Sequence, residues 1–214
     1  MGKQSDRAAR RGRPTGDHEA KRIELLRAAT AVIAEEGYAG ASLRKVAQRA
    51  GYTTGAVTYY FANKSEMIIA LVESRFDRYD AMLEHAREQT DIPALIRRWL
   101  AMTAGDSQHW PVMSELLVHA RSEPVLADLI RDRYARYRDA HAAIIKEAQA
   151  RGTIRDDIPA ELLGDQLVAM GDGWTMMYPF EPQRFVPSRA DELLDAVVEL
   201  IAPVREGSGR TDDA

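Results

Sequence analysis

The chain has 214 residues, of which 45% are hydrophobic and 29% charged, a composition typical of a globular protein. No stretch approaches the roughly 18 uninterrupted apolar residues that a membrane-spanning helix needs, so we expect no contact with a membrane. The chain contains no cysteine, which excludes disulfides and thiolate metal sites and fits a cytoplasmic protein.

The net charge of −4 conceals an asymmetry along the chain. Residues 1–64 carry 12 Lys/Arg and 6 Asp/Glu, whereas the remainder carries 17 and 27. The positive N-terminal third favours a polyanionic partner, although chance segregation of surface charge is the alternative. Residues 1–16 are rich in arginine and poor in apolar groups, which predicts a flexible basic arm along a phosphate backbone or, alternatively, a solvated tail.

The first predicted helices lie between residues 17 and 64. Apolar residues recur at helical spacing from Ile23 to Ile33, and this helix is expected to stop at Gly37. A second helix is predicted behind the N-cap Ser42 and ends at Gly51, which supplies a tight turn. A third, very short helix runs from Thr53 or Thr54 to about residue 60, so residues 42–61 read as a helix-turn-helix motif.

The second helix of this motif has the properties of a DNA-recognition helix. Val57 and Phe61 bury one side of it, which leaves short hydroxyls, near-bare backbone and two tyrosines on the open side. Such a surface can enter a major groove, and cations at the starts of the flanking helices can hold phosphates. The predicted DNA-binding residues are Ser42, Arg44, Thr53, Thr54, Gly55, Ala56, Thr58, Tyr59, Tyr60 and Lys64.

The rest of the chain also predicts helices, and we find no alternating strand pattern. Further helix starts are predicted at or directly behind Asn63, Pro93, Pro111, Pro124, Pro159 and Ser188. We therefore expect an all-α protein of about nine helices. The predicted parts are a basic arm (1–16), a three-helix DNA-binding domain (17–64), a helical ligand-binding and dimerisation domain (65–204) and a loose tail (205–214).

The motif resembles a known family. The pattern Ser-x-Arg-x-Val-Ala-x-x-Ala-Gly-x-x-x-Gly-x-x-x-Tyr-Tyr-Phe-x-x-Lys starts at Ser42 and is similar to that of the TetR/AcrR transcriptional regulators. The resemblance implies that Arg44 and Lys64 hold phosphates. Lys45, Thr58 and Tyr60 depart from common family choices, which should change the bases read rather than DNA binding itself. Residues 151–157 and 172–173 are similar to the branch that includes the choline-responsive betaine-regulon repressor.

The last two helices carry apolar stripes that suggest a homodimer. One stripe has the +4, +3 spacing of a coiled-coil seam, and the other is too wide for one neighbour. We predict an intersubunit four-helix bundle, as the family resemblance also implies, with burial inside one monomer as the alternative. The predicted interface residues are Leu163, Leu167, Met170, Trp174, Leu194, Val197, Val198 and Ile201.

Aromatic and methionine residues of the acidic C-terminal part predict a small-molecule pocket, although each alone is more often plain core. The candidates are Trp99, Met102, Trp110, Met113, Tyr134, Tyr137, His141 and Trp174. Aromatic rings beside an acid would also suit a cationic ligand. We therefore expect a ligand-responsive regulator, more plausibly a repressor than an activator, that a small molecule releases from a palindromic operator.

Two other classes of protein are the alternatives to a ligand-responsive regulator. A helical-bundle enzyme would need paired Glu-x-x-His motifs on facing helices, but the histidines are scattered, and Glu115 with His119 provides only two ligands. No nucleophile elbow or phosphate loop occurs, so we expect no catalytic residue, metal or cofactor. A ligand-independent DNA-binding protein would have no use for a long acidic domain rich in aromatic residues.

Overall fold

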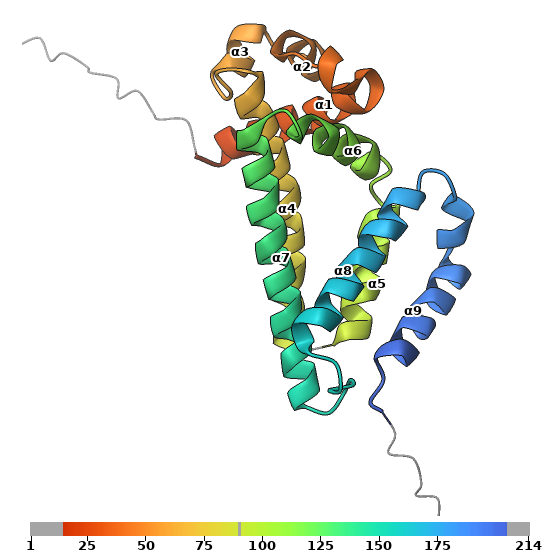
Figure 1. Ribbon diagram of the computed structural model, residues 1–214. Helices are drawn as coiled ribbons and strands as arrows, with labels where there is room; N and C mark the ends of the chain where they lie inside the picture. Colours follow the sequence, from red (N-terminus) through yellow and green to blue (C-terminus); the bar gives the residue numbers. More distant parts are fainter. Residues whose placement is uncertain (1–14, 90, 205–214) are drawn as a thin grey trace, which may run out of the picture. The chain divides into compact units, whose positions relative to one another are not determined.

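The computed structural model describes residues 15–89 and 91–204, and the regular structure of these residues is entirely helical (Figure 1). They form nine α-helices and one short 3-10 helix, which confirms the all-α prediction. The chain divides into two compact units, Met1–Ile68 and Ile69–Ala214. The predicted arm and tail lie outside the described residues, except that residues 15 and 16 already belong to the first helix. None of the helices described is long and apolar enough to cross a membrane.

The first unit contains α1 (Thr15–Gly40), α2 (Leu43–Ala50), α3 (Thr54–Thr58) and the start of α4 (Lys64–Gln89). Its core is apolar and closely packed, with Leu25, Ile33, Val46, Val57, Phe61 and Met67 among the buried residues. The predicted end of the first helix coincides with a break: Gly37 has φ 71° and ψ 170°, and the helix continues beyond it to Gly40 across a kink.

The turn between α2 and α3 depends on a left-handed glycine. Gly51 has φ 71°, and its N–H donates to the carbonyls of Ala47 and Gln48 at the end of α2. The N–H of Tyr52 donates to Ala47 O as well, at 2.8 Å. These bonds satisfy carbonyls that the helix end would leave without partners, so the chain turns sharply enough to begin α3 two residues later.

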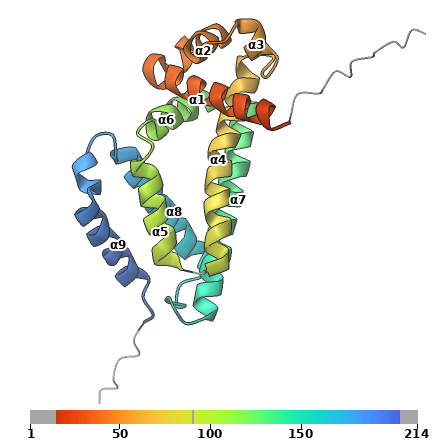
Figure 2. The same cartoon turned by 180° about the vertical axis from the view of Figure 1, so that it is seen from behind.

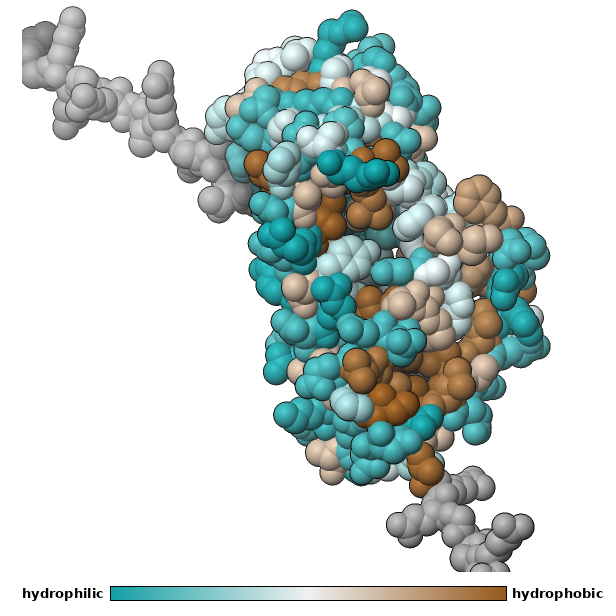
Figure 3. All heavy atoms as spheres, viewed as in Figure 1, coloured by the Kyte–Doolittle hydropathy of each residue, from teal (hydrophilic) through white to brown (hydrophobic). Residues whose placement is uncertain are grey.

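The second unit contains the rest of α4, α5 (Ile92–Ala104), α6 (His109–Ala120), α7 (Pro124–Ala150), α8 (Ala160–Met177), a 3-10 turn η1 (Pro182–Phe185) and α9 (Pro187–Ile201). α7 packs along α8, and α5 lies beside α9, as both views show (Figures 1 and 2). Arg133 on α7 is buried and bridges Asp77 and Asp80 on α4 at 2.7 and 2.8 Å. Hydrophobic side chains gather on the face over α8 and α9 (Figure 3).

Three helix starts differ from the sequence-based expectation, and the first is that of α5, which begins at Ile92, one residue before Pro93. α6 begins at His109, two residues before Pro111, because a proline in the first turn removes no intrahelical hydrogen bond. α9 begins at Pro187, and Val186 precedes it without a side-chain cap. The predicted N-cap Ser188 therefore lies inside the first turn, where Pro187 supplies a helical φ at the first position.

The loop between α7 and α8 holds the end of α9. Gln149 donates its side-chain amide to the carbonyls of Arg155 and Ile158, at 2.9 and 2.8 Å. Arg155 donates its backbone N–H to Ile201 O at 2.8 Å and its guanidinium to Leu200 O at 3.2 Å. A cation at a helix C-terminus complements the helix dipole, so this loop caps α9.

We expect Gly51→Ala to lower the stability of the protein by about 1–2 kcal/mol, because an L-residue at φ 71° is strained. A Cβ at this position would meet nothing within 4 Å, so the loss would measure backbone strain alone. Thermal unfolding followed by circular dichroism checks this. Gly55→Ala, in the neighbouring helix and without a positive φ, is the control; equal melting temperatures for the two variants would contradict the prediction.

Candidate functional site

The helix-turn-helix presents most of the predicted DNA-binding residues on one accessible segment. Ser42 accepts a hydrogen bond from Lys45 N at 3.3 Å and starts α2, while the Thr53 hydroxyl accepts from Ala56 N at 3.2 Å and starts α3. Arg44, Thr53, Thr54, Gly55, Thr58 and Tyr59 are exposed, whereas Ser42, Ala56, Tyr60 and Lys64 are half-buried. Because Val57 and Phe61 are buried, the exposed residues of α3 are not needed for packing.

The two tyrosines at the end of α3 form an aromatic cluster with a histidine from α1. The ring of His18 lies 4.6 Å from that of Tyr60 and 5.8 Å from that of Tyr59, centroid to centroid. Tyr59 is 75% exposed, which is unusual for so large an apolar ring and leaves it available to a partner. Sequence reasoning missed His18, because the contact joins residues about 40 positions apart and no local pattern signals it.

Three cations lie near the starts of α2 and α4, and their surroundings differ. Lys45 pairs with Glu36. Lys64 donates to Tyr38 O at 2.5 Å and lies 4.1 Å from the centre of the Tyr38 ring, and partial burial lowers its pKa. Arg44, in the first turn of α2, is exposed. The structure thus gives Lys45 and Lys64 a role in holding the glycine-kinked end of α1, while Arg44 remains oriented to solvent.

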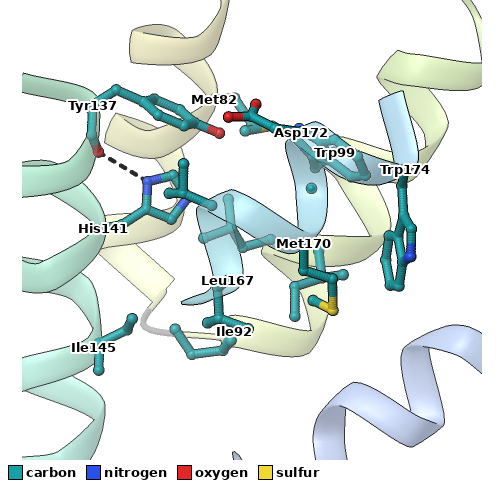
Figure 4. Close-up of a pocket in the computed structure, with 14 residues that line it drawn as sticks. Met82, Ile92, Trp99, Tyr137, His141, Ile145, Leu167, Met170, Asp172 and Trp174 are labelled. Atoms are coloured by element: carbon teal, nitrogen blue, oxygen red, sulfur yellow. Dashed lines mark hydrogen bonds between the residues drawn. The ribbon is translucent and has the colours of Figure 1, made fainter. Parts of the chain in front are cut away.

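The second unit contains an apolar cavity, which we call the main cavity (Figure 4). It holds about 560 Å³ of space free of protein atoms, a figure that includes open solvent. It is lined by Met82, Ile92, Leu95, Ile96, Trp99, Tyr137, His141, Ile145, Leu167, Val168, Met170, Gly171, Asp172 and Trp174. The aliphatic residues make it largely hydrophobic, and the polar groups Tyr137, His141 and Asp172 can orient a ligand.

A second cavity, which we call the polar chamber, shares Trp99, Tyr137 and Asp172 with the main cavity and holds about 410 Å³. Its lining is Arg75, Phe76, Tyr79, Trp99, His109, Met113, Tyr134, Tyr137, Asp172 and Thr175. A guanidinium, a carboxylate, an imidazole and three phenols therefore face a space beside the main cavity. The main cavity is thus suited to the apolar part of a ligand, and the polar chamber to a polar group.

Asp172 is the carboxylate common to both cavities. Burial raises its pKa to about 6, against the opposing effects of the Tyr134 hydroxyl and Arg138, although the residue keeps solvent-exposed surface. Its carboxylate and the hydroxyl of Tyr137 point toward one another (Figure 4). His141 bonds through Nδ1 to Tyr137 O at 2.9 Å, and burial lowers its pKa. The neutral ring thus donates from Nδ1 and leaves Nε2 as an acceptor.

The structure separates the predicted pocket residues into groups. Trp99, Tyr137, His141 and Trp174 line the main cavity, and Trp99, Met113, Tyr134 and Tyr137 line the polar chamber. Met102 instead lines a smaller cavity with Arg75, Arg78, Tyr79, Asp106 and His109, and Trp110 lines none of these three spaces. Sequence reasoning missed Arg75, Tyr79 and His109, because a lone arginine in a long helix signals a surface residue.

The predicted dimer-interface residues are turned inward. Leu163, Leu194, Val197 and Ile201 are at most 6% exposed and belong to the core of the second unit, and Val198 packs against the same core. Leu167, Met170 and Trp174 line the main cavity. Packing within one chain therefore buries four of the eight residues, whereas Leu167, Met170, Trp174 and Val198 stay partly exposed, and their place in a subunit contact remains a prediction.

A helix-turn-helix unit joined to a helical unit with an internal apolar cavity is the arrangement of a ligand-responsive DNA-binding regulator. Comparison with known proteins agrees with this class. Residues 25–71 match the model of bacterial regulatory proteins of the tetR family, and residues 88–203 match that of the C-terminal domain of BetI-type transcriptional repressors.

Individual relatives extend the match along the chain. An HTH-type transcriptional repressor of Streptomyces coelicolor is 30% identical over 168 residues, 76% of this chain and 82% of the relative. The structure of the SmeT–triclosan complex is 25% identical with a TM-score of 0.71, covering 88% of this chain and 93% of SmeT. A Saccharomonospora viridis transcriptional regulator in complex with choline is 20% identical with a TM-score of 0.69, covering 85% and 96%, and shows the same fold.

The chain belongs to the TetR family of transcriptional regulators. The enzyme alternative is not supported, because the matched models and relatives are regulators of transcription. Within the described part of the chain, no group of three or more His, Asp or Glu side chains is arranged to hold a metal ion.

We expect Asp172→Asn to remove a pH dependence of stability. The pKa of Asp172 is about 6 in the folded chain against an ordinary 3.8, so the folded state binds the proton more strongly. Ionisation therefore makes wild type less stable as the pH rises from about 4 through 6. Between pH 5 and pH 7.5 the melting temperature of wild type should fall relative to that of the variant. The control Asp165→Asn, exposed on the same helix, should follow wild type; parallel curves for Asp172→Asn would contradict the prediction.

Proposed function

We propose that this protein is a repressor that binds a palindromic operator as a homodimer and leaves it when a small molecule fills the main cavity. The observation that carries the proposal is the pairing of an exposed recognition helix with an internal apolar cavity in one chain. Helix α4 begins in the DNA-binding unit and runs on to Arg75 and Met82 beside the cavities. A repressor of this kind would act in the cytoplasm, where a bacterial chromosome lies.

The DNA-binding part of the proposal rests on the exposed residues of α2 and α3. The segment from Thr54 to Ala56 offers backbone and small side chains for the major groove, and Tyr59 can reach a phosphate or a base. Arg44 can neutralise a phosphate beside them. A twofold dimer would place two such helices about 34–36 Å apart, one turn of B-DNA, which is why a palindrome is expected.

We propose that the subunits meet through the outer faces of α8 and α9. On α8, Leu162, Gln166, Ala169 and Met176 are exposed, and with Gly173 they follow the +4, +3 spacing of a helix seam. A Cβ on Gly173 would meet nothing within 4 Å, so a partner helix could approach closely there. On α9, Leu200 is 65% exposed. The apolar members Leu162, Ala169, Met176 and Leu200 form an exposed stripe that the core of the second unit does not use.

The effector part of the proposal rests on the main cavity. Its lining is mainly apolar, and the aliphatic and methionine side chains can adapt to different ligand shapes. A ligand in the cavity would favour one arrangement of the surrounding helices. If it binds the DNA-competent arrangement less well, it lowers the affinity for the operator, and operator DNA lowers the affinity for the ligand by the same factor. The alternative of a ligand-independent DNA-binding protein gives this cavity no role.

DNA binding tests the proposal first. Fragments of the upstream region of the gene, or operators selected from random DNA, are titrated at several salt concentrations. We expect Arg44→Ala to weaken binding about tenfold and to reduce the salt slope by about one, as the loss of one phosphate contact should. Arg131→Ala is the control, because Arg131 is an exposed α7 residue already paired with Asp128. Absence of sequence preference in wild type would overturn the regulator proposal.

The dimer is tested by Ala169→Glu, which places a charge in the proposed seam without touching the core. Sedimentation should show a shift toward monomer, and operator affinity should fall with it, because each half-site is then bound separately. Ala143→Glu makes the same change at an exposed position of α7 and should leave the dimer intact. A dimer that survives Ala169→Glu as well as the control would refute this face as the interface.

A further inference from the structure

His141 presents a buried hydrogen-bond acceptor to the main cavity. The residue lies on α7, lines the cavity and is 8% exposed. Its Nδ1 lies 2.9 Å from the carbonyl oxygen of Tyr137, one turn earlier on the same helix. A carbonyl oxygen can only accept, so Nδ1 carries the hydrogen. Burial lowers the pKa of His141, so the ring is neutral and Nε2 keeps a free lone pair.

The lone pair of Nε2 has no donor within the described part of the chain, because the bond to Tyr137 is made through Nδ1. In Figure 4 the edge of the His141 ring that holds Nε2 points away from α7 and into the cavity. Ile145 on α7 and Leu167 on α8 line the same space with aliphatic side chains. A buried acceptor without a donor is costly, so a ligand that supplies one is favoured over a ligand that does not.

The other polar side chains of the main cavity do not supply this donor. The hydroxyl of Tyr137 and the carboxylate of Asp172 point toward one another (Figure 4). The rings of Tyr137 and His141 meet edge to face, with centroids 4.4 Å apart, which is a ring contact and not a hydrogen bond. The indoles of Trp99 and Trp174 lie on the opposite side of the cavity from His141 (Figure 4). The donor therefore has to come from the ligand.

The indoles opposite His141 suit a ligand with an aromatic body. Trp99 packs closely on α8, where a Cβ on Gly171 would lie only 3.2 Å from an indole carbon. The centroids of Trp99 and Trp174 are 6.2 Å apart, within the range of an aromatic pair. A further aromatic ring can pack against these indoles and direct a substituent toward His141.

We propose that the effector of the main cavity is a small aromatic molecule with a neutral hydroxyl group, a phenol in the simplest case, which donates its hydrogen to Nε2 of His141. A neutral donor fits this wall better than an ammonium group, because an ammonium would lose its hydration beside Ile145 and Leu167. This inference rests on the proposed effector-binding function and names its ligand class.

Three probes of similar size test the proposal: 4-ethylphenol, 1-ethyl-4-fluorobenzene and 4-ethylbenzylamine. Fluorine replaces the hydroxyl without donating, and the amine is charged at neutral pH. Affinities for the purified full-length protein are measured by isothermal titration calorimetry. We expect His141→Phe to lower the ratio of phenol affinity to fluoroarene affinity about tenfold, the effect of one hydrogen bond to a buried group. A merely structural role of His141 would weaken both probes equally, and an unchanged ratio would overturn the proposal.

Two more variants and one measurement on wild type complete the test. His141→Gln keeps an acceptor oxygen at a similar reach and should restore part of the ratio. His85→Phe alters an exposed α4 histidine outside both cavities and should leave the ratio unchanged. If His141→Phe does not fold, ¹⁵N NMR of the histidines in wild type decides, because the phenol should shift the Nε2 resonance of His141 and the fluoroarene should not.

The outcomes separate this inference from the function on which it rests. Equal ¹⁵N shifts with phenol and fluoroarene, or tighter binding of the amine than of the phenol, would overturn the hydroxyl donor while leaving the cavity as a ligand site. Failure of all three probes to bind would overturn both. Release of operator DNA is measured separately, so a probe that binds through His141 without releasing DNA would refute only the effector role.

Discussion

Helix α8 has to be apolar on two adjacent faces, and the organisation of the second unit depends on which face turns inward. Leu163, Leu167 and Met170 face the core and the main cavity, while Leu162, Ala169 and Met176 remain at the surface. One hundred degrees of rotation per residue separates the two series. The inward series joins α8 to α7 and forms one wall of the cavity. The helix that shapes the ligand site is therefore also the helix with apolar surface to offer to another subunit.

Because α8 is apolar on both sides, the sequence predicts the helix but does not decide which side of it meets a partner subunit. The series 163, 167, 170, 174 and the series 162, 166, 169, 173 have the same +4, +3 spacing, so periodicity cannot distinguish them. The series that starts at residue 163 has the larger apolar side chains, which is typical of a helix–helix interface. The same side chains also form the core of the second unit and a wall of the main cavity. Only the packing of α7 and α5 against α8 and α9 shows which residues are already used.

Local signals, in contrast, predicted the DNA-binding unit well. Ser42, Thr53 and Gly51 act through hydrogen bonds within four residues along the chain, so their effect can be read from neighbouring residues. The polar chamber depends on pairs such as Arg75 and His109, which are 34 residues apart. The ion pair of Lys45 with Glu36 is likewise a tertiary contact that the motif alone does not signal. Sequence reasoning therefore succeeded where the interaction is local.

The exposed side of α3 contributes little to packing, because Val57 and Phe61 anchor the helix from the opposite side. If α3 reads the operator as proposed, substitutions at Thr54, Gly55 or Thr58 would change the bases that are read at small cost to folding. Natural substitutions on the exposed side of α3 could therefore alter operator preference without compensating substitutions in the core. A duplicated gene of this kind could acquire a separate regulon through a few codon changes, while the cavity retains its ligand and the two copies diverge in which genes respond to the same signal.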